Sequence, residues 1–164
     1  MTPSKPDPNS PSSAIAGHDV EQILSVLETE LPHLFEQDIS YHIYTNDISF
    51  KDPVNTFKGK FNYRLIFWTL RFHGKLFFTQ LSFDLHETGQ TAADEIRAEW
   101  TVRGTLRLPW HPQILFNGFS IYRLNEQGLI FEHVDSWDRL PMEILRQFFQ
   151  RPGTDASASS KALR

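Results

Sequence analysis

Apolar and polar residues alternate along the second half of the chain, and this pattern predicts a series of long strands. The clearest run covers residues 95–108, where apolar side chains occupy nearly every second position from Ile96. A period of two over that length is typical of a strand with one buried face. Three further strands are predicted at residues 77–86, 115–124 and 129–137, with a loop at 87–93.

Apolar residues at helical spacing predict helices in the first half of the chain and at its end. A first helix is expected over 19–30, where Asp19 and Gln22 have the spacing of a capping box. Pro32 has no N–H to donate, so a short second helical piece should cover 32–37. The other predicted elements are a strand at 41–50 ended by Asp52-Pro53, a helix at about 60–73 and a closing helix at 141–149.

The helix at 60–73 is apolar on two faces, so we expect it to be covered on more than one side. One face holds Phe61, Leu65, Trp68 and Phe72, and another holds Tyr63, Ile66 and Leu70. A narrow basic stripe runs between them, formed by Lys60, Arg64, Arg71 and Lys75. This stripe is either a solvated helix face or a contact for anionic lipid headgroups.

The order of these elements predicts an α+β domain over residues 18–150. A curved antiparallel sheet should wrap around the N-terminal helices and leave a cone-shaped pocket between them. In order along the chain this is α-α-β-α-β-β-β-β with a short C-terminal helix. Residues 1–17 are rich in proline and serine, and together with residues 151–164 they are expected to be disordered tails.

Composition narrows the function classes. The 164 residues include 40% hydrophobic and 13% aromatic residues, enough to build a core. A net charge of −4 argues against nucleic acid as a partner. The absence of cysteine excludes disulfides and thiolate chemistry. No run approaches the roughly 20 apolar residues of a membrane span, so we expect a soluble protein. The sequence contains neither a glycine-rich phosphate loop nor clustered metal ligands, so we expect no cofactor and no metal.

The candidate chemistry lies on the last predicted strand. His133, Asp135 and Trp137 are spaced by two, which places them on one face that should look into the pocket. A histidine and a carboxylate in an apolar pocket can be tuned to act as a general base. The alternative is that Asp135 only holds His133 in place, as buried polar groups usually hold structural partners. Asp47, near the end of the first strand, is a further candidate acid or base.

Aromatic residues provide a candidate ligand site, which competes with simple core packing. The residues expected to line it are Trp68, Phe72, Trp100, Phe119, Trp137 and His111. On the opposite sheet face, Arg97, Arg103 and Arg107 alternate with Glu95 and Glu99. These charges indicate either cross-strand pairing on a solvated face or an interface for a homodimer.

The chain resembles the nuclear-transport-factor-2-like superfamily, also called the ketosteroid-isomerase-like or cone fold, over about residues 18–150. The segments that carry the resemblance are Tyr44 to Pro53, the long strand through Trp100, and His133 to Asp138. With Arg103 to Trp110 added, the chain resembles an uncharacterised family of cyanobacterial and plastid proteins. The resemblance implies the cone fold and a cytoplasmic location of the cyanobacterial type, but no catalytic residue set.

Three functions remain open from the sequence. The first is binding of a small apolar molecule without catalysis. The second is a cofactor-independent isomerase, dehydratase or cyclase that uses His133 and Asp135. The third is a dimerisation or protein-interaction module that uses the outer sheet face.

Overall fold

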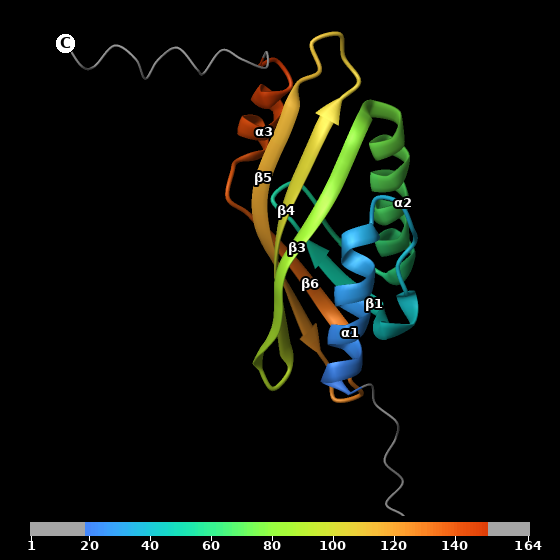
Figure 1. The fold of residues 1–164 in the computed structure, drawn as a ribbon. Helices are drawn as coiled ribbons and strands as arrows, with labels where there is room; N and C mark the ends of the chain where they lie inside the picture. The colour runs from blue at the N-terminus through green and yellow to red at the C-terminus, as the bar shows by residue number, and fades with distance from the viewer. Residues whose placement is uncertain (1–18, 151–164) are drawn as a thin grey trace, which may run out of the picture.

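Three helices and one six-stranded sheet make up the part of the chain that the computed structural model describes, residues 19–150 (Figure 1). The helices are α1 (Val20–Glu30), α2 (Lys60–Phe77) and α3 (Pro141–Gln147), with two short 3-10 turns, η1 (Leu31–His33) and η2 (Tyr41–Ile43). The strands are β1 (Tyr44–Lys51), β2 (Thr56–Lys58), β3 (Phe78–Ala92), β4 (Glu95–Leu106), β5 (Gln113–Leu124) and β6 (Ile130–Trp137). The predicted α+β class is confirmed, and the predicted tails lie outside the described residues.

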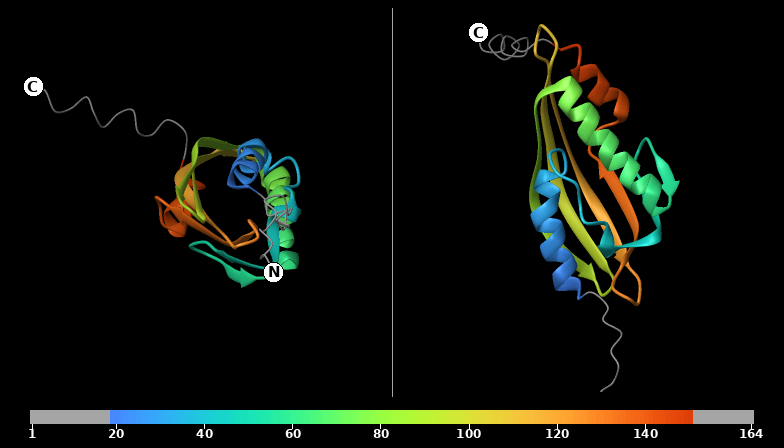
Figure 2. Two further views of the ribbon diagram at one scale, coloured as in Figure 1. Left: turned by 90° about the horizontal axis from the view of Figure 1, so that it is seen from below. Right: turned by 90° about the vertical axis from the view of Figure 1, so that its right-hand side faces the viewer.

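The sheet is strongly curved, and its strands follow the order β2-β1-β6-β5-β4-β3. Seen from below in Figure 2, it curls around a central space, and α1 and α2 lie across the open side. All neighbouring pairs are antiparallel except β1 and β6, which run parallel. The sheet is therefore mixed rather than purely antiparallel. Because most of the domain separates β1 from β6 in sequence, no hairpin fixes their relative direction.

The hairpin of β3 and β4 is longer than the sequence pattern predicts. Residues 87–93 were expected to form a loop, yet Thr88, Gly89 and Gln90 pair with residues of β4 and the strand continues to Ala92. These residue types are common in loops, but the backbone ladder to β4 outweighs their local preference. The hairpin therefore turns only at residues 93 and 94.

The helices begin where the sequence predicts, although their caps differ. Helix α1 follows Asp19, but the side chain of Asp19 makes no capping hydrogen bond. Its backbone carbonyl instead accepts hydrogen bonds from the N–H groups of Gln22 and Ile23. The predicted capping box is thus absent, and α1 is held mainly by burying Ile23 and Leu27 against the sheet.

Helix α2 is covered by the rest of the chain on one face only. Its buried residues are Tyr63, Phe67 and Gly74. The opposite face is exposed, with exposed fractions of 78% for Phe61 and 55% for Trp68. The prediction that this helix is covered on more than one side is wrong for the single chain.

Candidate functional site

A cavity of about 330 Å³ lies between the concave face of the sheet and the helical layer. Its sheet side is formed by residues of β4, β5 and β6, including Trp100, Tyr122 and Trp137. Its helical side is formed by residues of η1 and α2 and is almost wholly apolar. Val54 and Leu70 also line the cavity and are 62% and 40% exposed, so its mouth lies between the β1–β2 connection and α2.

Strand β6 carries the polar groups of this cavity. Successive side chains of a strand point to opposite faces, so His133, Asp135 and Trp137 share the inner face, and all three line the cavity. The placement of these residues follows the spacing seen in the sequence. The side chain of His133 is 4% exposed and that of Asp135 is 17% exposed.

A chain of hydrogen bonds connects these groups to α2, β5 and β4. The hydroxyl of Tyr63 lies 2.7 Å from Nδ1 of His133, and Nε2 of His133 lies 2.8 Å from Oδ1 of Asp135. The hydroxyl of Ser120 donates to the same Oδ1 at 2.5 Å, and the indole N–H of Trp100 donates to Ser120 at 2.9 Å. A carboxylate only accepts hydrogen bonds, so Nε2 of His133 carries a proton and donates it, and in the neutral ring Nδ1 accepts from Tyr63.

This arrangement decides which atom can meet a ligand. Both ring nitrogens of His133 are engaged, so His133 acts on a ligand only through its neighbours. On Asp135, Oδ1 accepts two hydrogen bonds, whereas Oδ2 accepts none from the residues that the structure describes. The second carboxylate oxygen of Asp135 is therefore an acceptor in the cavity wall that no hydrogen bond from residues 19–150 occupies.

Two buried tyrosines contact the histidine, and a third, Tyr44, packs against Tyr63. The rings of Tyr63 and Tyr122 both contact the imidazole, with ring centroids 5.8 and 4.3 Å from that of His133. Burial raises the pKa of the Tyr63 and Tyr122 hydroxyls well above the ordinary value, and it also raises the pKa of Tyr44. The low dielectric of this region disfavours the ionised phenolate, so all three hydroxyls stay protonated donors at neutral pH.

Alkaline pH is expected to destabilise the protein through these tyrosines. An unfolded tyrosine ionises near pH 10, while Tyr44, Tyr63 and Tyr122 ionise only at higher pH in the folded state. Their stabilising contribution is therefore complete below about pH 10 and is lost as the pH rises from there toward the folded pKa values. The slope reaches about 1.4 kcal/mol per pH unit for each tyrosine. Tyrosinate absorbance and far-ultraviolet circular dichroism, followed together, should change in one transition. Tyrosinate from these residues before any loss of structure would contradict this expectation.

The remaining candidates from the sequence do not line this cavity. Asp47 is exposed on β1, and Trp68 and Phe72 stack on each other on the exposed face of α2. Phe119 lies under the guanidinium of Arg97, 3.7 Å from its ring centroid. None of these residues therefore lies in one site with His133 and Asp135.

Two loop residues, His111 and Asp52, stand apart from this hydrogen-bonded group. His111 is exposed and adopts a φ of 45°, which is uncommon for a residue with a side chain. Asp52 lines the cavity near its mouth, but its carboxylate accepts hydrogen bonds from the backbone of Val54 and Asn55 and so closes a turn. This is the ordinary use of aspartate before proline.

The outer face of the sheet shows the charge pairing that alternation suggests. Arg97 pairs with Glu99 at 3.1 Å, Arg103 with Asp84 at 2.8 Å, and Arg123 with Glu95 and Glu132.

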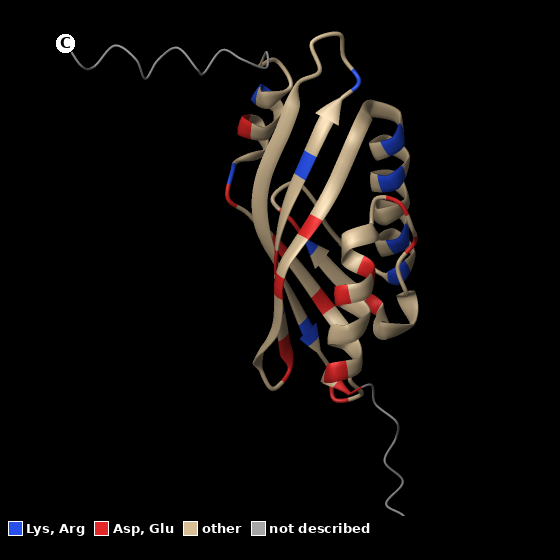
Figure 3. Cartoon of the chain, in the orientation of Figure 1, with Lys and Arg blue, Asp and Glu red and all other residues tan. Residues whose placement is uncertain are grey.

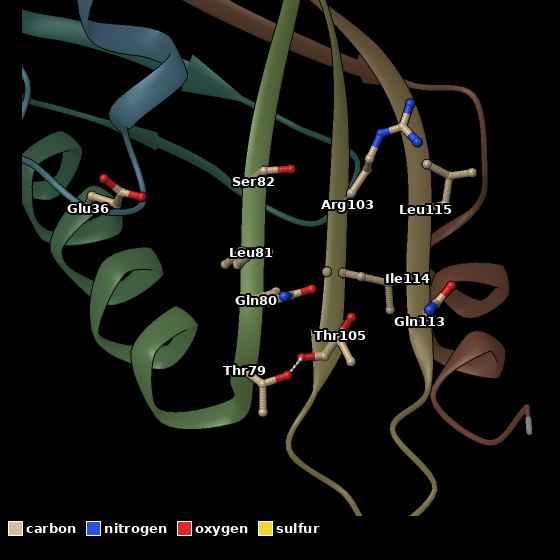
Figure 4. Close-up of a pocket in the computed structure, with 11 residues that line it drawn as sticks. Glu36, Thr79, Gln80, Leu81, Ser82, Arg103, Thr105, Gln113, Ile114 and Leu115 are labelled. Atoms are coloured by element: carbon tan, nitrogen blue, oxygen red, sulfur yellow. Dashed lines mark hydrogen bonds between the residues drawn. The ribbon is translucent and has the colours of Figure 1, made fainter. Parts of the chain in front are cut away.

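A hollow of about 660 Å³ also spans β3, β4 and β5 (Figure 4). It is lined largely by polar side chains such as Gln80, Ser82, Thr105 and Gln113. None of the catalytic or ligand-binding candidates lies there.

The sequence pattern did not reveal Tyr63, Ser120 and Tyr122 as part of the site. Ser120 offers the clearest signal, because it is a polar residue at an inward position of β5, directly opposite Asp135 in the β5–β6 register. Tyr63 comes from α2, which is 70 residues earlier than His133 and meets it only in the folded chain. Within residues 19–150 no group of three metal-ligating side chains converges, and no helix is long and apolar enough to cross a membrane.

Comparison with solved structures identifies the fold. An NTF2-like protein of unknown function from Cytophaga hutchinsonii matches with a TM-score of 0.55 and 14% identity, over 69% of this chain and 93% of that one. SalBIII, an epoxide hydrolase/cyclase-like enzyme described for pyran ring formation in salinomycin, matches with a TM-score of 0.54 and 15% identity, over 72% and 92%. TsrD from Streptomyces laurentii matches with a TM-score of 0.57 and 19% identity, over 79% and 96%. These likenesses establish an NTF2-like fold, as the sequence resemblance implied.

Sequence comparison identifies the family. No curated protein matches the chain. A family model described as "Uncharacterized conserved protein (DUF2358)" matches residues 21–133, which run from α1 to the histidine of the cavity. The match covers more than half of the sequence, so the chain belongs to the DUF2358 family and carries that family's sequence on an NTF2-like fold.

Proposed function

We propose that this protein binds a small, largely apolar molecule in the cavity and holds one polar group of that molecule on Asp135. The observation that carries the proposal is the unpartnered Oδ2 of Asp135 in a wall formed mainly by apolar and aromatic side chains. A volume of about 330 Å³ falls in the range of small-ligand pockets. One oriented polar group among aromatic side chains is the usual composition of such sites.

The pair of 2-naphthol and naphthalene tests this proposal. Both are apolar aromatic probes, but only 2-naphthol has a hydroxyl to donate to Asp135. A hydrogen bond to a charged acceptor contributes about 1.5–3 kcal/mol, so the wild type should bind 2-naphthol at least about tenfold more tightly than naphthalene. Asp135→Asn should lose most of this preference, and Asp47→Asn, which removes an exposed carboxylate outside the cavity, should keep it. Equal preference in all three proteins would contradict the assignment of Asp135.

Native mass spectrometry of gently purified protein provides an independent test. The wild type is expected to carry a stoichiometric apolar mass, which organic extraction would then identify. Asp135→Asn should carry about tenfold less of it, by the same hydrogen-bond energy. A natural molecule retained equally by both proteins would place its binding elsewhere.

The same geometry favours a second candidate, a cofactor-independent proton transfer such as an isomerisation or cyclisation. A carboxylate with one oxygen fixed by His133 and Ser120 and the other free is oriented as a general base. It would take a proton from a carbon of the bound molecule and return it to another atom of the same molecule. SalBIII, an epoxide hydrolase/cyclase-like enzyme, has a similar fold, and the likeness extends to the fold alone.

Solvent deuterium exchange distinguishes this enzyme from a binder. When the molecule extracted from the wild type is returned to the protein in heavy water, an enzyme of this kind should introduce deuterium at a carbon position. The exchange should stop in Asp135→Asn and continue in Asp47→Asn. Binding without exchange in the wild type would favour the binding function.

A further inference from the structure

The exposed face of α2 is a feature of the molecule that the cavity does not explain. Residues spaced by three and four along the helix form one apolar stripe: Phe61, Leu65, Trp68, Phe72 and Leu76. Their exposed fractions range from 48% to 78%. At 1.5 Å per residue the stripe is about 22 Å long. Contiguous exposed apolar surface of this kind marks an interaction site.

A basic row runs beside this stripe. It consists of Lys60, Arg64, Arg71 and Lys75, and α2 contains no aspartate or glutamate, although the whole chain has a net charge of −4. Figure 3 shows Lys and Arg recurring along α2, whereas α1 carries acidic residues. Arg71 is paired with Asp38 at 2.8 Å. The other three form no ion pair with any residue in the range 19–150, although the guanidinium of Arg64 lies 4.9 Å from the ring centroid of Tyr41. No carboxylate of these residues therefore neutralises their charge.

The other parts of this chain do not match the stripe. Residues 1–18 and 151–164 contain only three large apolar side chains, Met1, Ile15 and Leu163. A second copy packed through the same face with the two α2 helices antiparallel would bring the two basic rows together, because a two-fold contact uses the same surface twice. Like charges placed in this way oppose association.

We propose that α2 docks the protein on the surface of an anionic lipid bilayer. The aromatic and leucine side chains of the stripe would enter the interface, and the adjacent cations would contact the headgroups. A helix with Trp, Phe and Leu on one face and Lys and Arg beside it has the composition of an interfacial amphipathic helix. This surface faces away from the cavity, so the inference is independent of the proposed ligand.

Sedimentation with vesicles tests the proposal. The full chain is expected to sediment with vesicles of equal parts phosphatidylcholine and phosphatidylserine, and much less with phosphatidylcholine alone. Added salt should weaken the binding. Lys75→Gln should weaken it about fivefold, the effect of one cation near a charged surface. Trp68→Ser should weaken it roughly tenfold, since it removes a buried aromatic side chain from the interface.

Phe149→Ser provides the matched control. Phe149 is 80% exposed and lies outside α2, so its loss should leave vesicle binding unchanged. Circular dichroism should confirm that each variant is folded. Sedimentation that is equal with and without phosphatidylserine would overturn the proposal. It would also be overturned if analytical ultracentrifugation showed a dimer that Trp68→Ser dissociates, because a second copy would then occupy the stripe.

Discussion

Replacing Gly118 with alanine is expected to lower the free energy of unfolding by about 3 kcal/mol or more. A Cβ atom at this position would lie 2.4 Å from Cη2 of Trp100 and 2.6 Å from the backbone oxygen of Ser136. The backbone of β6 cannot move away without breaking its pairing with β5, and the Trp100 ring is confined in the core. Neither neighbour can therefore move away from the added Cβ atom at a small cost in free energy. Urea unfolding of the variant and the wild type measures the effect.

Gly89→Ala is the matched control for this prediction. Gly89 is also a strand glycine, but a Cβ there would meet nothing within 4 Å. Its replacement should change the free energy of unfolding by no more than about 1 kcal/mol and could be slightly stabilising, because glycine loses more backbone entropy on folding. Similar losses in both variants would show that packing against Trp100 is not the cause. The Gly118 variant should also disturb the cavity, because Trp100 donates its indole hydrogen bond to Ser120.

His133→Ala is expected to cost about 3–4 kcal/mol of stability, even though His133 touches a ligand only indirectly. The change empties a buried space and removes the partners of the Tyr63 hydroxyl and of Asp135. Cavity formation and the unsatisfied buried groups both contribute. Asp135→Asn should cost only about 1 kcal/mol, since the amide oxygen still accepts from His133 and Ser120.

His133→Ala and Asp135→Asn separate the structural role of His133 from the proposed ligand-binding role of Asp135 by different measurements. Urea unfolding should rank His133→Ala as the more destabilising change, while 2-naphthol binding in the folded state should depend on Asp135. His86→Ala is the control, because His86 is an exposed histidine with one hydrogen bond, to Thr101, and its loss should cost less than about 1 kcal/mol. A His133→Ala protein as stable as the control would mean that the hydrogen-bond chain does not hold the cavity wall.

The sequence pattern predicted the strands that carry the site residues more accurately than it predicted the bounds of the neighbouring strand β3. Strand β4 alternates over its whole length, and β6 places His133 and Asp135 two residues apart, so the shared face of these two residues follows from the geometry of any strand. The helix positions also followed from local spacing. The extension of β3 to Ala92 did not, because it depends on the ladder to β4 and not on the residues themselves.

Helix α2 shows where sequence reasoning reached its limit. Trp68 and Phe72 were expected in the ligand site because aromatic residues fill pockets, yet Tyr63 and Phe67 of the same helix face the sheet. The helix is apolar on both sides, so its periodicity does not decide which face turns inward. Packing against β1 and the cavity decided it.

The sequence by itself determined the α+β class, the order of elements and the face of β6 that carries the polar groups, because these depend on local periodicity and on chain order. Only the tertiary structure decided which atom of that face is free. The hydroxyl of Tyr63 from α2 and that of Ser120 from β5 occupy the positions that leave Oδ2 of Asp135 as the open acceptor. Hydrogen bonds between distant segments depend on distances that no local pattern encodes.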